Sequence, residues 1–595
     1  MASTEYSKAN DDLLKKTMKR FDDSWDYAAS TWHRRWERDW KLYNNERYRK
    51  NYEGITDTFV PMTFSTIETM AAALGNGRPR FDYEADDPMK SETSTKPLNA
   101  LTDEFWEADQ WDVKVYEGIR EMLKKGTSPF MMYWDIDRPR LITFDIRDFI
   151  VDPTCTSQQD IQERGYAGRR FFVRKGTLDD YMVVDTDPDS KTYGELVKRY
   201  KDIDEESTSP TGDNDSGKKA TEMFMGSTLK TAAEDQDELI EIWDKDSCVT
   251  VKNRKCIIEN RKNAYKERHE MKLREKYQAE LDVAIDPKAF EAADQRAKAE
   301  AKGVIPFFLF RNYTDVNLIY AKSEIEPIAP LQEQLNDMSN QEGDSIIKQL
   351  AQQRELDPQY QDWIDLIDDD PSTVYPFTPG SLKNIDSPQV PPNSFNNRMN
   401  IKNEIRETTA IDQVAKGSAN VKDTTATEVK AQLNQAGQRI EIKARLLEKD
   451  GFYWMAKILF HMVQLYVDRP QAVRVNTDGT QEVTMVGDVQ LPPGVGVYNP
   501  ADFEGDWQPH VTLEVDSQNK KVEQQRSALQ MYQILIQDPT NNLAEIKRIY
   551  LPKITDLDQA ELDAILSPSP EQAMMDPAMA GGAPAEMPME VPNGA

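Results

Sequence analysis

The sequence predicts an α+β fold. Apolar residues recur at three- and four-residue spacings through much of 393–468, which is the period of a helix with one buried face. Residues 130–150 and 238–259 instead alternate apolar and polar side chains, as half-buried strands do. Further helical patterns cover 8–52 and 98–125, so helices and strands are both well represented.

The longest predicted element is a helix that starts near Asp423 or Thr424 and runs unbroken to Asp468. Asp423, Thr424 or Thr425 can cap its N-terminus, and Arg469-Pro470 ends it. A helix of this length spans roughly 65 Å at 1.5 Å per residue, which is too long for an ordinary domain core. A coiled coil or a bundle helix explains the periodicity equally well.

Composition limits the classes of function. The chain has 595 residues, enough for several domains, and a formal net charge of -30, which argues against a protein that coats nucleic acid. The charge is compatible with a channel through which DNA slides. We expect no signal peptide and no membrane-spanning segment, because no run of about 18 apolar residues occurs.

The N-terminal helical region is unusually aromatic. Arginines lie among the aromatic residues of this region. The aromatic residues follow one helix face and are Trp25, Trp32, Trp36, Trp40 and Tyr43. Aromatic residues beside arginines can stack on bases, but at this spacing they more often form a core with a basic edge. We therefore expect core packing.

Two motif lookalikes lie in an acidic, polar stretch. Residues 212–219 match a Walker A motif, except that Lys219 replaces the required Ser or Thr and no apolar strand precedes them. Asp185, Asp187 and Asp189 begin like an EF-hand loop that lacks its glycine and its final glutamate. Both are interpreted as solvated turns, and 202–235 as a mobile surface loop.

No catalytic or metal motif stands out. Cys155, Cys248 and Cys256 are too few for a disulfide framework, and the last two are expected in a hairpin. No histidine has a ligand-spaced partner, whether His33, His269, His461 or His510. The sequence therefore predicts neither an enzyme nor a bound cofactor or metal.

Three further stretches complete the order of elements. Residues 262–302 are charged and helix-forming, with a break at Asp286-Pro287, and are expected to form a helical hairpin on the surface. Residues 323–355 contain SEIEPIAPLQEQLNDMS and predict a helix, whereas 357–392 are acidic and proline-rich with little helical period. A shorter helix follows at 393–414 and breaks at KGSAN, residues 416–420.

This order of elements resembles the portal, or head-to-tail connector, proteins of tailed bacteriophages. The similarity rests on the short helix, polar loop and long helix TTATEV, on FVPMTFSTIETMAAAL, on the Val151-Asp152-Pro153 turn and on the SEIEPIAPLQ run. It covers roughly 20–180 and 300–470, and 262–302 has no counterpart that we can match.

The resemblance implies a portal-like protomer, assembled as a ring, with a mixed wing, a helical stem, a small clip, a long wing helix and a helical crown. The implied boundaries are wing 1–321, first stem helix 322–356, clip 357–392, second stem helix 393–414, channel loop 415–424, long wing helix and strands 425–516, crown 517–566 and disordered tail 567–595.

The same resemblance implies a DNA-conducting ring of twelve copies. The ring would be assembled in the host cytoplasm and would lie at one capsid vertex of the virion. Implied partners are the terminase large subunit, the major capsid and scaffolding proteins, a head-tail adaptor and double-stranded DNA, with no membrane. Channel-loop residues would be Lys416, Gly417, Ser418, Asn420 and Lys422, and clip contacts Trp363, Ile364, Asp368, Asp369 and Asp370.

Two other classes of protein remain as alternatives. An ATP-driven motor or nuclease subunit is disfavoured by the defective Walker pattern. A phage scaffold or tail component without a DNA channel would also explain long helices and scarce apolar residues.

Overall fold

The structure is a computed structural model that divides into two compact units, Met1–Gln471 with Tyr498–Val515, and Ala472–Val497 with Asp516–Ala595. It describes residues 2–48, 53–75, 77–86, 95–174, 182–184, 196–198, 236–280, 287–350, 354–367, 377–385, 390–409, 439–474, 485–486, 489–490, 495–513, 529 and 531–532. These residues form a mixed α+β fold, as the sequence predicts.

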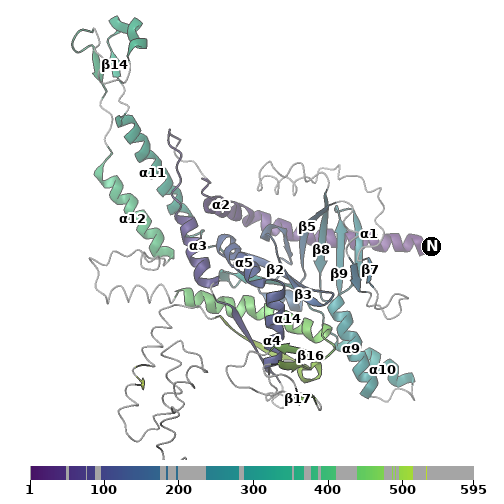
Figure 1. Ribbon diagram of the computed structural model, residues 1–595. Helices are drawn as coiled ribbons and strands as arrows, with labels where there is room; N and C mark the ends of the chain where they lie inside the picture. Colours follow the sequence, from purple (N-terminus) through teal and green to yellow (C-terminus); the bar gives the residue numbers. More distant parts are fainter. Residues whose placement is uncertain are drawn as a thin grey trace, which may run out of the picture. The chain divides into compact units, whose positions relative to one another are not determined.

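A five-stranded antiparallel sheet forms one part of the first unit, and the long helix α1 (Ala2–Thr31) lies across it (Figure 1). Phe21 of α1 packs with Ile240, Ile242 and Val251 of the sheet in one buried cluster. The strands run in the order β10 (Cys256–Lys262), β9 (Ser247–Lys252), β8 (Gln236–Trp243), β5 (Ala167–Arg174) and β4 (Phe149–Val151).

The predicted hairpin that contains Cys248 and Cys256 is confirmed, because β9 and β10 pair across a short turn. The predicted aromatic core is also confirmed. Trp32 and Trp36, at the start of α2 (His33–Tyr43), are buried and pack against Tyr320.

A second, three-stranded sheet packs against helices. Its order is β11 (Phe307–Arg311), β2 (Thr127–Asp135) and β3 (Arg138–Thr143), and the helices beside it include α5 (Trp111–Lys125). Gly118 lets α5 approach this sheet closely, since a Cβ there would lie 1.9 Å from the Phe130 ring. Helices α3 (Met62–Gly75) and α4 (Lys96–Ala108) pack in turn on α5.

Several shorter elements also belong to the first unit. They are β1 (Pro79–Ala85) paired with β20 (Trp507–Leu513), β12 (Tyr313–Asp315) paired with β13 (Leu318–Lys322), β6 (Met182–Val184) paired with β7 (Leu196–Lys198), α6 (Gln158–Glu163), η2 (Ile146–Asp148) and η7 (Pro500–Phe503).

The charged stretch at 262–302 forms two helices, α9 (Ala264–Glu280) and α10 (Pro287–Glu300), as the proline at position 287 predicts. Tyr277, Ala293 and Ala297 give the pair a small core of its own. Arg268 and Lys272 donate to the carbonyls of Leu465 and Gln464, so α9 also contacts the C-terminal end of the predicted long helix, near Asp468.

The described part of the predicted long helix starts at residue 439 and is helical without a break, but it is not α-helical throughout. A π-helical turn, η6 (Glu448–Phe452), precedes α14 (Tyr453–Tyr466). A Cβ at Gly451 would lie 2.4 Å from the Phe310 ring, so glycine lets this turn lie directly on β11. The helix also ends at Tyr466, two residues earlier than predicted.

In the second unit, strand β16 (Gln471–Arg474), which begins at the last residue of the first unit, pairs with β19 (Val495–Tyr498), and β17 (Met485–Val486) pairs with β18 (Val489–Gln490). The loop at 202–235, both motif lookalikes, the tail at 567–595 and nearly all of 517–566 lie outside the described residues.

Candidate functional site

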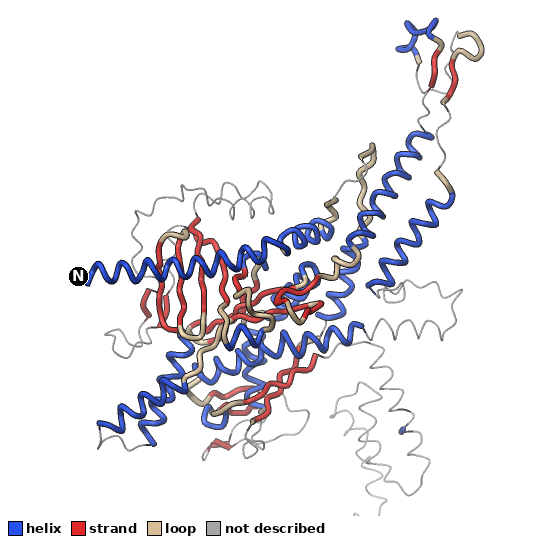
Figure 2. Tube along the Cα trace, turned by 180° about the vertical axis from the view of Figure 1, so that it is seen from behind, coloured by secondary structure: helices blue, strands red, loops and turns tan. Residues whose placement is uncertain are grey.

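Two helices form the centre of the candidate site and lie side by side in both views (Figures 1 and 2). They are α11 (Ala329–Leu350) and α12 (Pro392–Thr409). Leu335 of α11 and Ile401 and Ile405 of α12 share one buried cluster. A hydrogen bond and an ion pair also connect the two helices. Glu342 accepts from Ser394 at 2.8 Å and lies 3.0 Å from Arg398. These contacts fix the lengthwise register of the pair.

A buried polar stripe occupies another face of α11. Gln332, Asn336, Asn340 and Asp344 are spaced four residues apart, so they form one stripe, and all are buried. Buried polar groups need hydrogen-bond partners, and here the extended residues 55–60 supply them.

The contacts along this stripe form a ladder. Asn340 accepts from the Thr58 amide at 2.8 Å and donates to the Thr58 carbonyl at 3.1 Å. Asp344 accepts from the Thr56 amide at 2.7 Å, and Asn336 from the Val60 amide at 3.0 Å. The N-terminal part of the chain is therefore bound to α11 through side chains that sequence alone would place on a solvated face.

The segment between the two helices is more ordered than the sequence suggests. Short strands β14 (Arg354–Leu356) and β15 (Leu382–Asn384) pair, and a 3-10 helix, η5 (Pro358–Leu366), follows β14. Tyr360 packs against Phe377, with ring centroids 5.1 Å apart. Three-residue strands carry too little periodicity to be found by sequence analysis.

The predicted clip residues divide between described and undescribed parts. Trp363 and Ile364 lie on η5, and the Ile364 side chain is 55% exposed. Asp368, Asp369 and Asp370 lie outside the described residues.

All five predicted channel-loop residues also lie outside the described part of the chain, which omits 410–438. The two helices that flank this gap are in contact with each other. Arg439 donates to the carbonyls of Glu407 and Thr408 at the C-terminus of α12, both at 3.3 Å. A cation there also complements the negative end of the helix dipole.

One turn further along, a buried ion pair joins the same helix to the segment between β13 and α11. Lys443 contacts Glu324, and both side chains are largely buried. Asn312 accepts from Lys443 at 3.0 Å, and the Tyr313 ring lies 4.1 Å from its ammonium. Burial lowers the pKa of Lys443, and Glu324 opposes that shift. Lys443 therefore connects its helix to an earlier part of the chain that is distant in the sequence.

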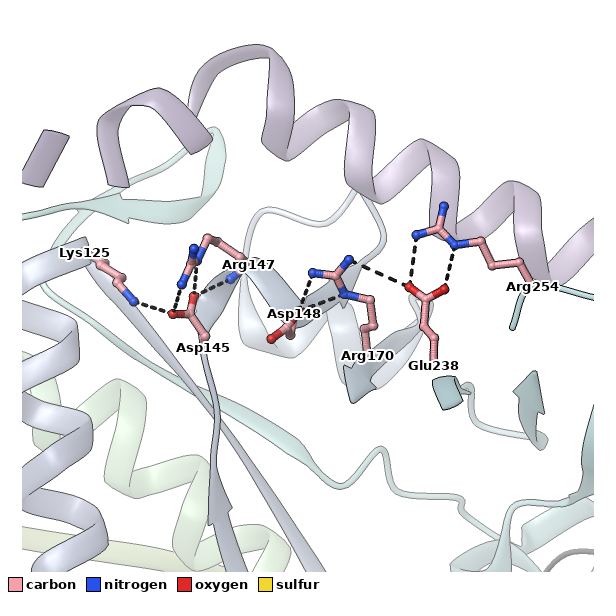
Figure 3. A network of polar contacts seen from close by, with 7 residues as sticks. All are labelled: Lys125, Asp145, Arg147, Asp148, Arg170, Glu238 and Arg254. Atoms are coloured by element: carbon pink, nitrogen blue, oxygen red, sulfur yellow. Dashed lines mark hydrogen bonds and ion pairs between the residues drawn. The ribbon is translucent and has the colours of Figure 1, made fainter. Parts of the chain in front are cut away.

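A second buried charge network supports the five-stranded sheet beneath α1 (Figure 3). Asp145 lies 2.6 Å from Lys125 and 2.7 Å from Arg147. Burial alone would raise the pKa of Asp145, but these two cations hold it well below its usual range. Asp145 is thus an ionised structural carboxylate.

The network continues through Arg170, which lies 2.6 Å from Asp148 and 3.8 Å from Glu238. Glu238 also pairs with Arg254 at 3.0 Å. The guanidinium groups of Arg170 and Arg254 lie over the rings of Trp25 and Phe21 of α1. The charges therefore anchor the N-terminal helix.

The fold brings together two histidines that are far apart in the sequence. The rings of His269 and His461 lie 5.6 Å apart. Burial lowers the pKa of His461 to about 3, so its imidazole is neutral. Within the described ranges, no cluster of three or more metal-binding side chains occurs.

Residues 296–490 match the family model described as phage SU10 portal protein. Over this segment the chain is similar to phage portal proteins. The segment contains α11, α12, the β14–β15 hairpin and α14, which are the elements that form the candidate site.

The match confirms the resemblance to portal proteins over about a third of the chain. It supports a phage portal role and a place in the virion capsid, within a family that is structural and not enzymatic. No curated protein matched the chain. Among the described helices, none has the length and apolar content needed to cross a membrane.

Proposed function

We propose that this chain forms the DNA-conducting ring at one capsid vertex, docks the terminase large subunit during genome packaging, and later joins the head-tail adaptor. The match of residues 296–490 to a phage portal domain carries the proposal. The ring would hold about twelve copies, and double-stranded DNA would enter and leave through it.

The proposed domain boundaries are those predicted from the sequence. The α11–α12 pair supports a stem at 322–356 and 393–414, because two antiparallel helices are joined there by a small folded tip. That tip supports a clip at 357–392, and the contact of Arg439 with α12 supports a loop at 415–424 whose two flanking helices are held together.

We propose that the clip contacts terminase through Trp363, Ile364 and the aspartates at 368–370. Exposure of Ile364 supports this, since an apolar side chain in water is stabilised by docking. The loop residues Lys416, Gly417, Ser418, Asn420 and Lys422 are proposed to face the DNA, and each exposed lysine would contribute well under about 1 kcal/mol per phosphate contact.

The test of terminase docking is a packaging assay with Trp363→Ser/Ile364→Ser rings. We expect intact rings, by microscopy, that package DNA several-fold more slowly than the wild type. Phe64→Ser, which removes an exposed apolar side chain on α3, is the matched control. Normal packaging by the clip variant would refute the proposed terminase contact of the clip. Wild-type protein that forms no rings would refute the portal assignment itself.

A further inference from the structure

Three cations of α12 lie on one stripe of the helix. Arg398, Lys402 and Arg406 are spaced four residues apart, so successive side chains follow one another at about 6 Å along the axis. The chain as a whole has 104 acidic and 74 basic residues. A stripe of three cations is therefore a local reversal of the overall charge.

Of these three cations, only Arg398 forms an ion pair with a carboxylate of the described residues. Arg398 pairs with Glu342 of α11. Lys402 has no hydrogen bond or ion pair with any described residue, and Arg406 donates within the described chain only to the Asn403 amide oxygen, at 3.3 Å.

The acidic residues of α12 do not compensate the stripe. Glu404 lies two positions from Lys402, about half a turn around the helix, and Glu407 is about 100° from Arg406. Burial lowers the pKa of Lys402, and repulsion from Arg398 and Arg406 lowers it further, while Glu342 of α11 only partly opposes the shift. An anion placed beside Lys402 and Arg406 would relieve that repulsion.

We propose that Lys402 and Arg406 form a phosphate-contacting stripe for the backbone of double-stranded DNA. The inference rests on the proposed function and adds a contact to it, on the stem helix and outside the predicted loop. Partly exposed lysine and arginine side chains bind phosphate without reading sequence, so the contact would be independent of base sequence. Each is weak and screened by salt, which suits a surface that DNA slides along.

The experiment measures binding of the assembled full-length protein to a linear duplex over a range of salt concentrations. The slope of log K against log salt reports the number of neutralised phosphates, at about 0.9 per contact. If the DNA contacts the stripe of one protomer, Lys402→Ala/Arg406→Ala removes two phosphate contacts and should reduce the slope by about 2. Lys402→Arg/Arg406→Lys should retain the wild-type slope, because both charges remain.

The control removes two exposed cations on another helix, with Arg445→Ala/Lys449→Ala, and should leave the slope unchanged. A closed circular duplex should bind more weakly than the linear one if the stripe faces a channel that must be threaded. Equal slopes for wild type and the α12 alanine variant would overturn the proposal.

Ring formation separates the remaining outcomes. If Lys402→Ala/Arg406→Ala abolishes rings while the control variant assembles, the cations are contacts to a second copy and the DNA assignment is wrong. If wild-type protein forms no rings, the proposed function fails first. Rings with an unchanged slope would refute only the stripe.

Discussion

The half-buried imidazole of His33 makes stability sensitive to mild acid. The ring lies between Trp25 and Trp36, and its Nε2 atom is buried without a hydrogen-bond partner among the residues that the structure describes. Burial, followed by Arg147 and Arg170, lowers its pKa from 6.5 to about 4. The folded protein therefore binds this proton less readily than the unfolded chain does.

A lowered histidine pKa means that stability is present above pH 6.5 and is lost as the pH falls toward 4. The full shift corresponds to about 3 kcal/mol. As the pH is lowered from 6.5 to 4, we expect the thermal unfolding midpoint of His33→Gln to fall less than that of the wild type. His510→Gln, at an exposed position, is the control, and parallel pH profiles for His33→Gln and the wild type would contradict the account.

The pair Lys443–Glu324 gives a second residue-scale prediction. Removing one partner leaves the other charge buried and unpaired, which costs about 3 to 5 kcal/mol. Lys443→Met and Glu324→Leu should each lower the unfolding midpoint strongly, whereas the double variant should recover much of that loss. The measurement is chemical unfolding of all three variants, and additive losses in the double variant would show that the two charges do not interact.

At the scale of elements, the ladder between α11 and residues 55–60 predicts a local effect. Asn340→Ala removes both the acceptor and the donor for Thr58, at a cost of about 1 to 3 kcal/mol. Hydrogen exchange at the Thr58 amide should become faster, with little change in the five-stranded sheet. Gln341→Ala, the exposed neighbour, should have no such effect, and unchanged exchange at Thr58 in Asn340→Ala would refute the ladder.

Sequence reasoning succeeded where side-chain pattern reflects local structure. The Trp32 and Trp36 positions predicted a core, and Pro287 correctly marked the break between two helices. It failed where burial depends on a distant segment. The polar stripe of α11 resembles a solvated face until residues 55–60 cover it, and no local signal identifies that partner.

The candidate site was predictable in part, for the same reason. Helices α11 and α12 follow from periodicity, and the portal resemblance from their order. The Lys443–Glu324 pair and the His269–His461 contact join residues more than a hundred positions apart, so no spacing rule could reveal them. The π-helical turn was missed because its apolar spacing continues through Gly451 almost unchanged.

At the scale of the whole molecule, apolar side chains remain exposed on the elements proposed as stem and clip. They include Ile346, Ile347 and Leu350 of α11, Phe395 and Met399 of α12, and Ile364 of η5. Such surface in a single copy favours association, and closed rings are the form in which one repeated contact leaves no free end.

The central claim, that this chain is a ring-forming portal, is tested most directly by electron microscopy of the purified full-length protein with native mass measurement of the same sample. The account predicts a closed ring of about twelve copies with a central hole. Fibres, or a stable monomer at micromolar concentration, would contradict it.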